Sequence, residues 1–216
     1  GSEEGYENER PKHNVTISNP FYISIATITQ EQWESMGMEN RSQFKGNKLP
    51  VENVSWDDSC IFLMALTKKF GEIFRLPTEA EWEYACKAGS KPSYSFGSSS
   101  SVLEEYAWFN KNSGQKTHEV ASKKCNQFGV YDMHGNVWEW CQDCYVQDYY
   151  KKSPSKDPMG PIGSKISPKV YRGGSWNNVA SDLRCSMRHG NLPGWRDYTT
   201  GIRPVMVVGK SHRKKV

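Results

Sequence analysis

The stretch from Phe128 to Arg203 places the tightest limits on how this chain can fold. It opens with a glycine-punctuated block, GVYDMHGNVWEW over residues 129–140, in which carboxylate, amide and backbone carbonyl groups stand beside two indoles. Such a composition suits an oxygen-lined metal site or a buried polar hub. Residues 177–200 show neither helical nor strand periodicity over most of their length and mix aromatic with short polar side chains. That segment is therefore predicted to be a loop that carries binding groups.

Three capping boxes in the first half of the chain predict three short helices. Each begins with a Thr or Ser that is followed three residues later by Gln, Asp or Glu, and these starts are Thr29, Ser55 and Thr78. Gly71 and Gly89 are expected to end the second and third helices. The apolar face of the second helix is predicted to comprise Cys60, Leu63, Met64 and Phe70. Residues 15–17 and 21–25 alternate as strands around Asn19-Pro20 and predict a hairpin.

Length and composition favour one domain with no nucleic-acid partner. The chain has 216 residues and a formal charge of only +4, much of it in a basic tail over residues 209–216. No apolar run is long enough to span a membrane. Residues 1–14 are interpreted as an N-terminal tail in which Gly1-Ser2 is a tag scar, so a signal peptide or lipid-anchor cysteine could have been removed. Cys141 and Cys144 are interpreted as structural thiols or as one disulfide.

Four blocks occur in order along the chain: RLPTEAEWEYA from Arg75, YDMHGNVWEW from Tyr131, RGGSW from Arg172 and GIR from Gly201. Together they resemble the signature blocks of the formylglycine-generating-enzyme (sulfatase-modifying factor) family, and the resemblance runs from about residue 15 to residue 207. It implies an α+β, loop-rich variant of the C-type lectin fold with short helices and small sheets. We therefore expect a single domain of this kind over residues 15–208.

The resemblance also implies a calcium site in the second block. The family's ligands match the side chains of Asp132 and Glu139 and the backbone carbonyls of Gly135 and Val137, which form the oxygen shell that a hard cation prefers. The alternative is that the two carboxylates accept hydrogen bonds from turn amides and hold no metal. A second calcium site of the family needs an Asn near the position of Ala107, and that ligand is missing.

The family's oxidase chemistry uses a copper-binding pair of cysteines, spaced C-x4-C, just after the Gly-Gly-Ser block. Here residues 176–183 contain no cysteine, and Cys185 matches a packing position further downstream. Copper(I) needs soft thiolate ligands, so neither copper nor this oxidase activity is expected. An enzyme alternative stays open, in which Cys185 or the Cys141/Cys144 pair supports a copper-independent oxidation.

Residues 172–203 resemble the variable region of diversity-generating-retroelement proteins, which use the same lectin-like fold. Rigid aromatic side chains among short polar ones are the chemistry of adaptable binding surfaces. We therefore expect a non-catalytic binding protein whose loop, at about residues 177–200, is diversified to bind a protein or carbohydrate ligand. The candidate ligand-contacting residues are Asn177, Asn178, Val179, Asp182, Met187, His189, Asn191, Trp195, Asp197, Tyr198 and Thr199.

The same resemblance implies a monomeric lipoprotein at the cell surface or outer membrane, held only by a lipid anchor that lies outside this sequence. Two alternatives remain beside the enzyme. One is a degenerate, structural relative of the oxidase, and the other is a subunit of a surface assembly that uses the fold without a pocket. If the binding interpretation is right, the candidate residues should be exposed and should share one face.

Overall fold

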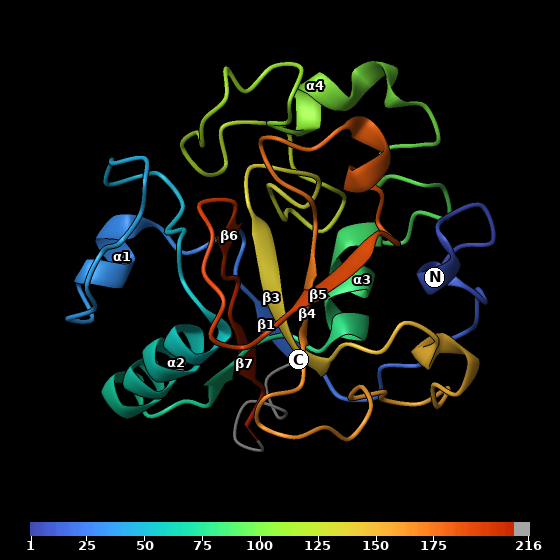
Figure 1. Ribbon diagram of the computed structural model, residues 1–216, viewed down its shortest axis with the longest axis horizontal. Helices are drawn as coiled ribbons and strands as arrows, with labels where there is room; N and C mark the ends of the chain where they lie inside the picture. The colour runs from blue at the N-terminus through green and yellow to red at the C-terminus, as the bar shows by residue number, and fades with distance from the viewer. Residues whose placement is uncertain (210–216) are drawn as a thin grey trace.

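The computed structural model describes residues 1–209, and the rest of the expected basic tail lies outside the described residues. Short helices surround two small sheets in a loop-rich α+β fold (Figure 1), as predicted. The α-helices are α1 (Gln30–Glu34), α2 (Trp56–Phe70), α3 (Glu79–Lys87) and α4 (Leu103–Tyr106). The 3-10 helices are η1 (Glu7–Glu9), η2 (Ser100–Val102), η3 (Tyr149–Lys151) and η4 (Ala180–Leu183). Within residues 1–209, none of the helices has the length and apolar character needed to cross a bilayer.

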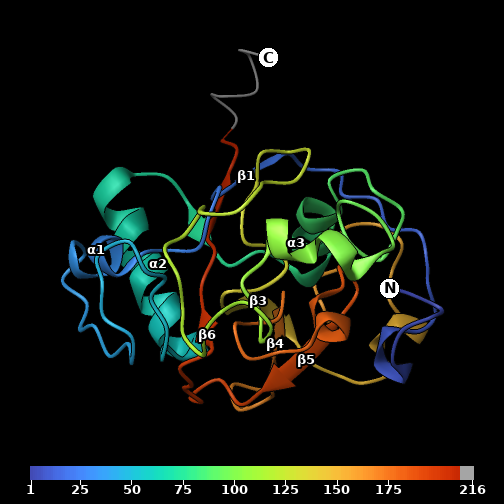
Figure 2. The ribbon, with the colours of Figure 1, turned by 90° about the horizontal axis from the view of Figure 1, so that it is seen from above.

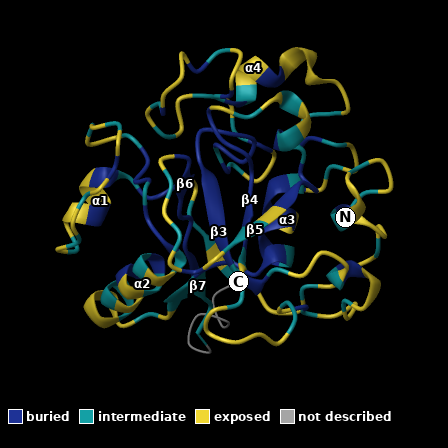
Figure 3. Cartoon of the chain, in the orientation of Figure 1, coloured by how far each residue is buried: buried dark blue, intermediate teal, exposed yellow. Residues whose placement is uncertain are grey.

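A four-stranded sheet with the order β5-β4-β3-β6 forms the centre of the molecule. Its strands are β3 (Trp138–Cys144), β4 (Lys169–Arg172), β5 (Arg188–Asn191) and β6 (Thr200–Gly201). Pairing is antiparallel from β3 to β4 and from β4 to β5, and parallel from β3 to β6. Helices α1 and α2 lie on one side of this sheet, and α3 and the N-terminal segment lie on the other (Figures 1 and 2). Figure 3 shows β3 and β4 buried, with exposed loops around them.

The second sheet has the order β1-β7-β2 and is antiparallel throughout. It consists of β1 (Phe21–Ile23), β2 (Phe74–Arg75) and β7 (Val205–Val207). The predicted hairpin of residues 15–17 with 21–25 is therefore wrong. Strand β1 pairs with β7 from the far end of the chain, and Thr16 forms an isolated bridge with Lys156.

All three capping boxes are confirmed. The side chains of Thr29, Ser55 and Thr78 each accept a hydrogen bond from the backbone N–H three residues later. The predicted apolar face of α2 is wrong in part, because Met64 and Phe70 are exposed, whereas Leu63 is buried as expected. Since α2 packs on the sheet with Phe62 and Leu63, the other two side chains lie outside that interface.

The N-terminal segment belongs to the folded domain, which corrects its interpretation as a tail. Glu9 is fully buried, and its carboxylate accepts hydrogen bonds from Arg184, at 2.6 and 2.7 Å, and from Ser186, at 2.6 Å. The side chain of Asn8 donates to the backbone carbonyl of Arg188 at 3.0 Å. Because these partners lie more than 170 residues away in sequence, local composition could not reveal the contacts.

Candidate binding face and the frame beneath it

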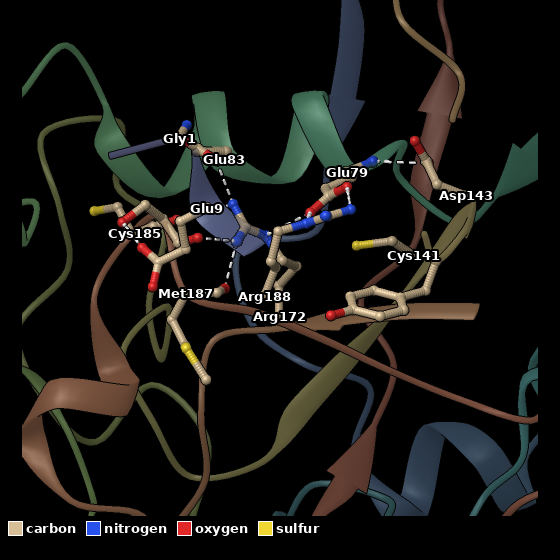
Figure 4. A network of polar contacts seen from close by, with 12 residues as sticks. Gly1, Glu9, Glu79, Glu83, Cys141, Asp143, Arg172, Cys185, Met187 and Arg188 are labelled. Carbon is tan, nitrogen blue, oxygen red and sulfur yellow. Dashed lines mark hydrogen bonds and ion pairs between the residues drawn. The ribbon is translucent and has the colours of Figure 1, made fainter. Parts of the chain in front are cut away.

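A buried network of ion pairs joins helix α3 to strands β4 and β5. Arg188 donates to both carboxylate oxygens of Glu79, at 2.6 and 2.7 Å, and Arg172 donates to Glu83. Both arginines are fully buried, and Figure 4 shows their guanidinium groups beneath the helix. Burial alone would raise the pKa of Glu79, but the two arginines outweigh it and hold that pKa below its usual value. Charges buried and paired in this way fix α3 against the sheet.

Arg172 also holds the chain that leads into the candidate binding segment. Its guanidinium donates to the backbone carbonyls of Ser186, at 2.7 Å, of Cys185, at 3.0 Å, and of Met187. Other residues hold the segment in the same way. The indole of Trp176 donates to the carbonyl of Tyr198 at 3.2 Å, and the backbone N–H of Asn53 donates to the carbonyl of Asp197 at 2.9 Å. These contacts use main-chain atoms of the segment, so they do not depend on its side chains.

The first group of candidate residues surrounds an aromatic stack at strand β5. Tyr171 of β4 lies opposite His189 of β5, which brings their rings together. The Tyr171 ring stacks on that of His189 with centroids 5.3 Å apart and on that of Trp195 with centroids 6.1 Å apart. Tyr171 is buried, Trp195 and Asn191 are partly buried, and His189 is exposed. The rings of His189 and Trp195 therefore offer aromatic surface to a ligand, and the buried ring of Tyr171 supports them.

A second aromatic contact lies just before strand β6. Tyr198, which is 47% exposed, stacks on Trp176 with ring centroids 6.0 Å apart, and Phe44 meets Trp176 edge-on at 5.6 Å. The carboxylate of Asp197 accepts hydrogen bonds from the backbone N–H and the hydroxyl of Thr199. Asp197 therefore shapes the turn that presents Tyr198, and its carboxylate is only partly available for ligand contacts.

The remaining candidates lie on and before η4, which packs against α4 through Leu183 and Ala180. The side chain of Asn178 accepts from the backbone N–H of Ser175 at 3.1 Å and donates to Asp182 at 3.2 Å. Both side chains are thus engaged within the loop. Asn177 and Val179 are exposed.

Two features of the predicted surface need correction. Met187 and Thr199 are buried, so in this structure they support the segment and offer little side-chain area to a ligand. The other candidates form three groups instead of one. One lies at the aromatic stack of His189 and Trp195, a second lies at Tyr198 on Trp176, and the third lies at η4 beside α4 (Figure 1).

Of the two carboxylates expected to bind calcium, Glu139 forms a buried ion pair and Asp132 accepts a hydrogen bond from a backbone amide. Both carboxylate oxygens of Glu139 accept hydrogen bonds from Arg203, at 2.7 and 2.8 Å, and one also accepts from the indole of Trp82 at 2.6 Å. Asp132 accepts from the backbone N–H of Ala121 at 2.7 Å, and burial raises the pKa of Asp132 to about 6. A carboxylate already neutralised by a guanidinium does not fit a calcium ion, which needs anionic oxygens free to bind it. Both carboxylates are hydrogen-bonded, as the alternative expects, and calcium at this site stays a prediction.

The thiols proposed for the enzyme alternative lie in the interior. Cys141 and Cys185 are almost completely buried, and burial raises the pKa of the Cys141 thiol well above its ordinary value. Cys144 is also buried and accepts a hydrogen bond from the ammonium group of Lys169 at 3.4 Å. Because the thiolate is the reactive form, the setting of Cys141 disfavours oxidation chemistry at this pair.

A loop-rich α+β domain with these signature blocks at its centre defines a class of C-type-lectin-like proteins. The chain belongs to the family described as the sulfatase-modifying factor enzyme 1-like domain, whose pattern matches residues 1–208.

Two curated relatives show how the family is used elsewhere. The chain is 33% identical over 230 residues to the serine/threonine-protein kinase Pkn1 of Chlamydia trachomatis, covering 94% of this chain and 36% of the kinase. It is 32% identical to the formylglycine-generating enzyme of Streptomyces coelicolor, covering 71% of this chain and 51% of the enzyme. The chain thus spans about a third to a half of the length of these relatives.

Solved structures give the same fold. Treponema denticola variable protein 1 matches with a TM-score of 0.85 and 32% identity over 91% of this chain and 87% of that protein. PvdO from Pseudomonas aeruginosa matches with a TM-score of 0.84 and 26% identity over 96% of this chain and 89% of that protein. A variant of the Major Tropism Determinant shares the fold at 13% identity, with a TM-score of 0.50 over 87% of this chain and 50% of that protein.

Proposed function

We propose that this chain is a non-catalytic binding domain, displayed at a cell surface by an anchor outside this sequence, whose ligand contacts the side chains of residues 177–198. The contact surface is centred on His189, Trp195 and Tyr198. Asn191 and Asp197 supply polar specificity beside these rings, while Asn177 and Val179 extend the surface at η4. The likeness to a variable protein of T. denticola supports this proposal.

One observation carries the proposal: the main chain of this segment is held from outside by groups that bind its backbone carbonyls. Beyond the contacts of Arg172 and Trp176, the imidazole of His134 hydrogen-bonds the carbonyl of Leu183 at 2.7 Å, and the hydroxyl of Tyr94 donates to that of Ala180 at 2.8 Å. Side chains on such a segment can change while its path stays fixed. That property suits a surface whose identity is varied to change the ligand.

The experiment uses two defined probe sets, a phage-displayed random-peptide library and a glycan array, to find ligands of the purified chain. Each ligand is then titrated against single alanine variants of His189, Trp195 and Tyr198. A matched control is Phe128→Ala, since Phe128 is 50% exposed and lies outside the segment. We expect at least one of the three variants to weaken binding about 30-fold or more, the effect of losing a hot-spot side chain worth about 2 kcal/mol. The control should bind as the wild type does.

Stability separates a binding role from a structural one. Alanine variants of His189 and Tyr198 should keep the melting temperature of the wild type to within a few degrees, because their outer faces meet solvent. Ligands that bind a triple alanine variant of His189, Trp195 and Tyr198 as tightly as the wild type would refute the proposal. Oxygen uptake above background with a cysteine-containing peptide would instead support the oxidase alternative.

A further inference from the structure

A cysteine, a histidine and a second cysteine meet in the interior, away from the binding face. Cys86 comes from α3, His134 from the turn before β3, and Cys185 from the chain between η4 and β5. One ligand atom from each lies within 4.8 Å of the other two, and all three residues are at least 98% buried. Two thiols and an imidazole at such separations can converge on one small cation with only slight side-chain movement.

The hydrogen bonds of the His134 imidazole define which ring nitrogen is able to act as a ligand. Its Nδ1 lies 2.7 Å from the backbone carbonyl of Leu183 and therefore carries the proton, which leaves the lone pair on Nε2. In metal proteins, such a bond from the second ring nitrogen commonly fixes the tautomer. Nε2 accepts from the hydroxyl of Ser95 at 2.8 Å and from its backbone N–H at 3.2 Å. A cation would take the place of these two donors at Nε2.

One residue of the cluster also lies beside a cavity. Cys185 lines a polar cavity of about 270 Å³, together with Lys12, Lys87 and Lys91 and the acidic residues Glu3 and Glu4. Two thiolates balance the charge of a divalent ion. Without a metal, burial and the neighbouring Cys185 thiol raise the pKa of the Cys86 thiol well above its ordinary value, and the guanidinium of Arg172 opposes this only in part. Carboxylates are not part of the set, which argues against calcium or magnesium.

We propose that Cys86, His134 and Cys185 form a binding site for a thiophilic d10 metal ion, either Zn²⁺ or Cu⁺. Soft thiolate ligands with an imidazole select these ions over hard cations. Binding replaces the proton of each thiol by a bond to the metal and releases two protons. None of the three side chains reaches the exposed face, although His134 also holds the Leu183 carbonyl of the binding segment.

The test starts from reduced, metal-free protein under nitrogen. Co²⁺ is titrated as a spectroscopic probe for the zinc arm, followed by displacement with Zn²⁺. Cu⁺ is titrated separately against a chromophoric chelator, so the two arms identify the ion. We expect one equivalent to bind, with thiolate-to-cobalt absorption. Binding should fall at least 100-fold in Cys86→Ser and Cys185→Ser and at least 10-fold in His134→Gln. Cys141→Ser is the matched control, since Cys141 is equally buried but outside the cluster, and it should bind normally.

A measurement on the wild type keeps the proposal testable if the serine variants fail to fold. X-ray absorption at the metal edge of the loaded protein should show two sulfur ligands, at about 2.3 Å for zinc. A shell of nitrogen and oxygen only, no binding in either arm, or unchanged binding in both serine variants would overturn the site. Quantitative oxidation of Cys86 and Cys185 to a disulfide that survives the reducing buffer would overturn it as well.

Discussion

Replacing Glu139 with glutamine decides whether this residue serves an ion pair or a calcium ion. In the structure its carboxylate is 99% buried and receives three short hydrogen bonds, from Arg203 and Trp82. The substitution removes the negative charge and leaves the guanidinium of Arg203, itself fully buried, without its counter-ion. Breaking a buried pair in this way costs about 3–5 kcal/mol. That is a large share of the roughly 5–15 kcal/mol by which a domain is stable.

The assay is urea unfolding followed by tryptophan fluorescence, performed in excess EDTA and again in millimolar Ca²⁺. We expect Glu139→Gln to lose the same free energy of unfolding in both buffers. The double variant Glu139→Gln/Arg203→Met should lose less free energy of unfolding than the two single variants lose together, because each single change leaves one buried partner unpaired. The control is Glu104→Gln, which removes an exposed partner of Lys111 and should leave stability unchanged.

One outcome would refute this reasoning about Glu139. If Ca²⁺ stabilises the wild type by an amount that grows with the logarithm of its concentration, and Glu139→Gln abolishes that gain, the carboxylate binds calcium. The ligand set implied by the family resemblance would then be right, and the ion pair with Arg203 would belong to the metal-free form.

Three further changes test other parts of the structure. Burial raises the pKa of Glu52 from 4.5 to about 7, so folding disfavours its charge, and stability should fall by about 3 kcal/mol as pH rises from 4.5 to 7. Glu52→Gln should be more stable than the wild type at pH 8, and its free energy of unfolding should lack this fall with pH. If the urea midpoints of the two proteins change with pH in the same way, the prediction about Glu52 is wrong. Deleting residues 1–14 should lower the melting temperature markedly, because Glu9 is buried against Arg184; an unchanged melting temperature would restore the tail interpretation. Gly135→Ala would place Cβ 2.3 Å from the Trp108 carbonyl oxygen and should lower the free energy of unfolding in urea by roughly 1–3 kcal/mol. An unchanged free energy would mean that the backbone at this turn shifts to make room for Cβ.

Local signals in the sequence predicted α1, α2 and α3 because a capping box is complete within four residues, whereas α4, which lacks one, was not predicted. Thr78 and Glu81, for example, satisfy each other's backbone donors wherever α3 finally lies. The family resemblance predicted the fold and the central blocks for a different reason, since it draws on residues far apart in the chain. Pairings such as β1 with β7, or Glu9 with Arg184, have no local signature. The burial of Met187 has no local signature either, because it depends on the pairing of the adjoining strand β5 with β4.

The chemistry of the buried ion-pair network shows how the proposed binding surface and a stable domain can share one chain. Buried arginines pair with acidic residues of the signature blocks, and Arg172 also donates hydrogen bonds to the backbone carbonyls of residues 185–187. A side chain that binds main-chain carbonyls makes the same bond whatever residue supplies the carbonyl. The stability of the segment therefore resides in Arg172 and its neighbours, while exposed positions such as His189 and Tyr198 contribute little to it. Arg172→Lys should accordingly destabilise the whole domain in urea, since a lysine lacks the planar fork that reaches several acceptors at once, whereas His189→Asn should change ligand binding and leave the urea midpoint where it was.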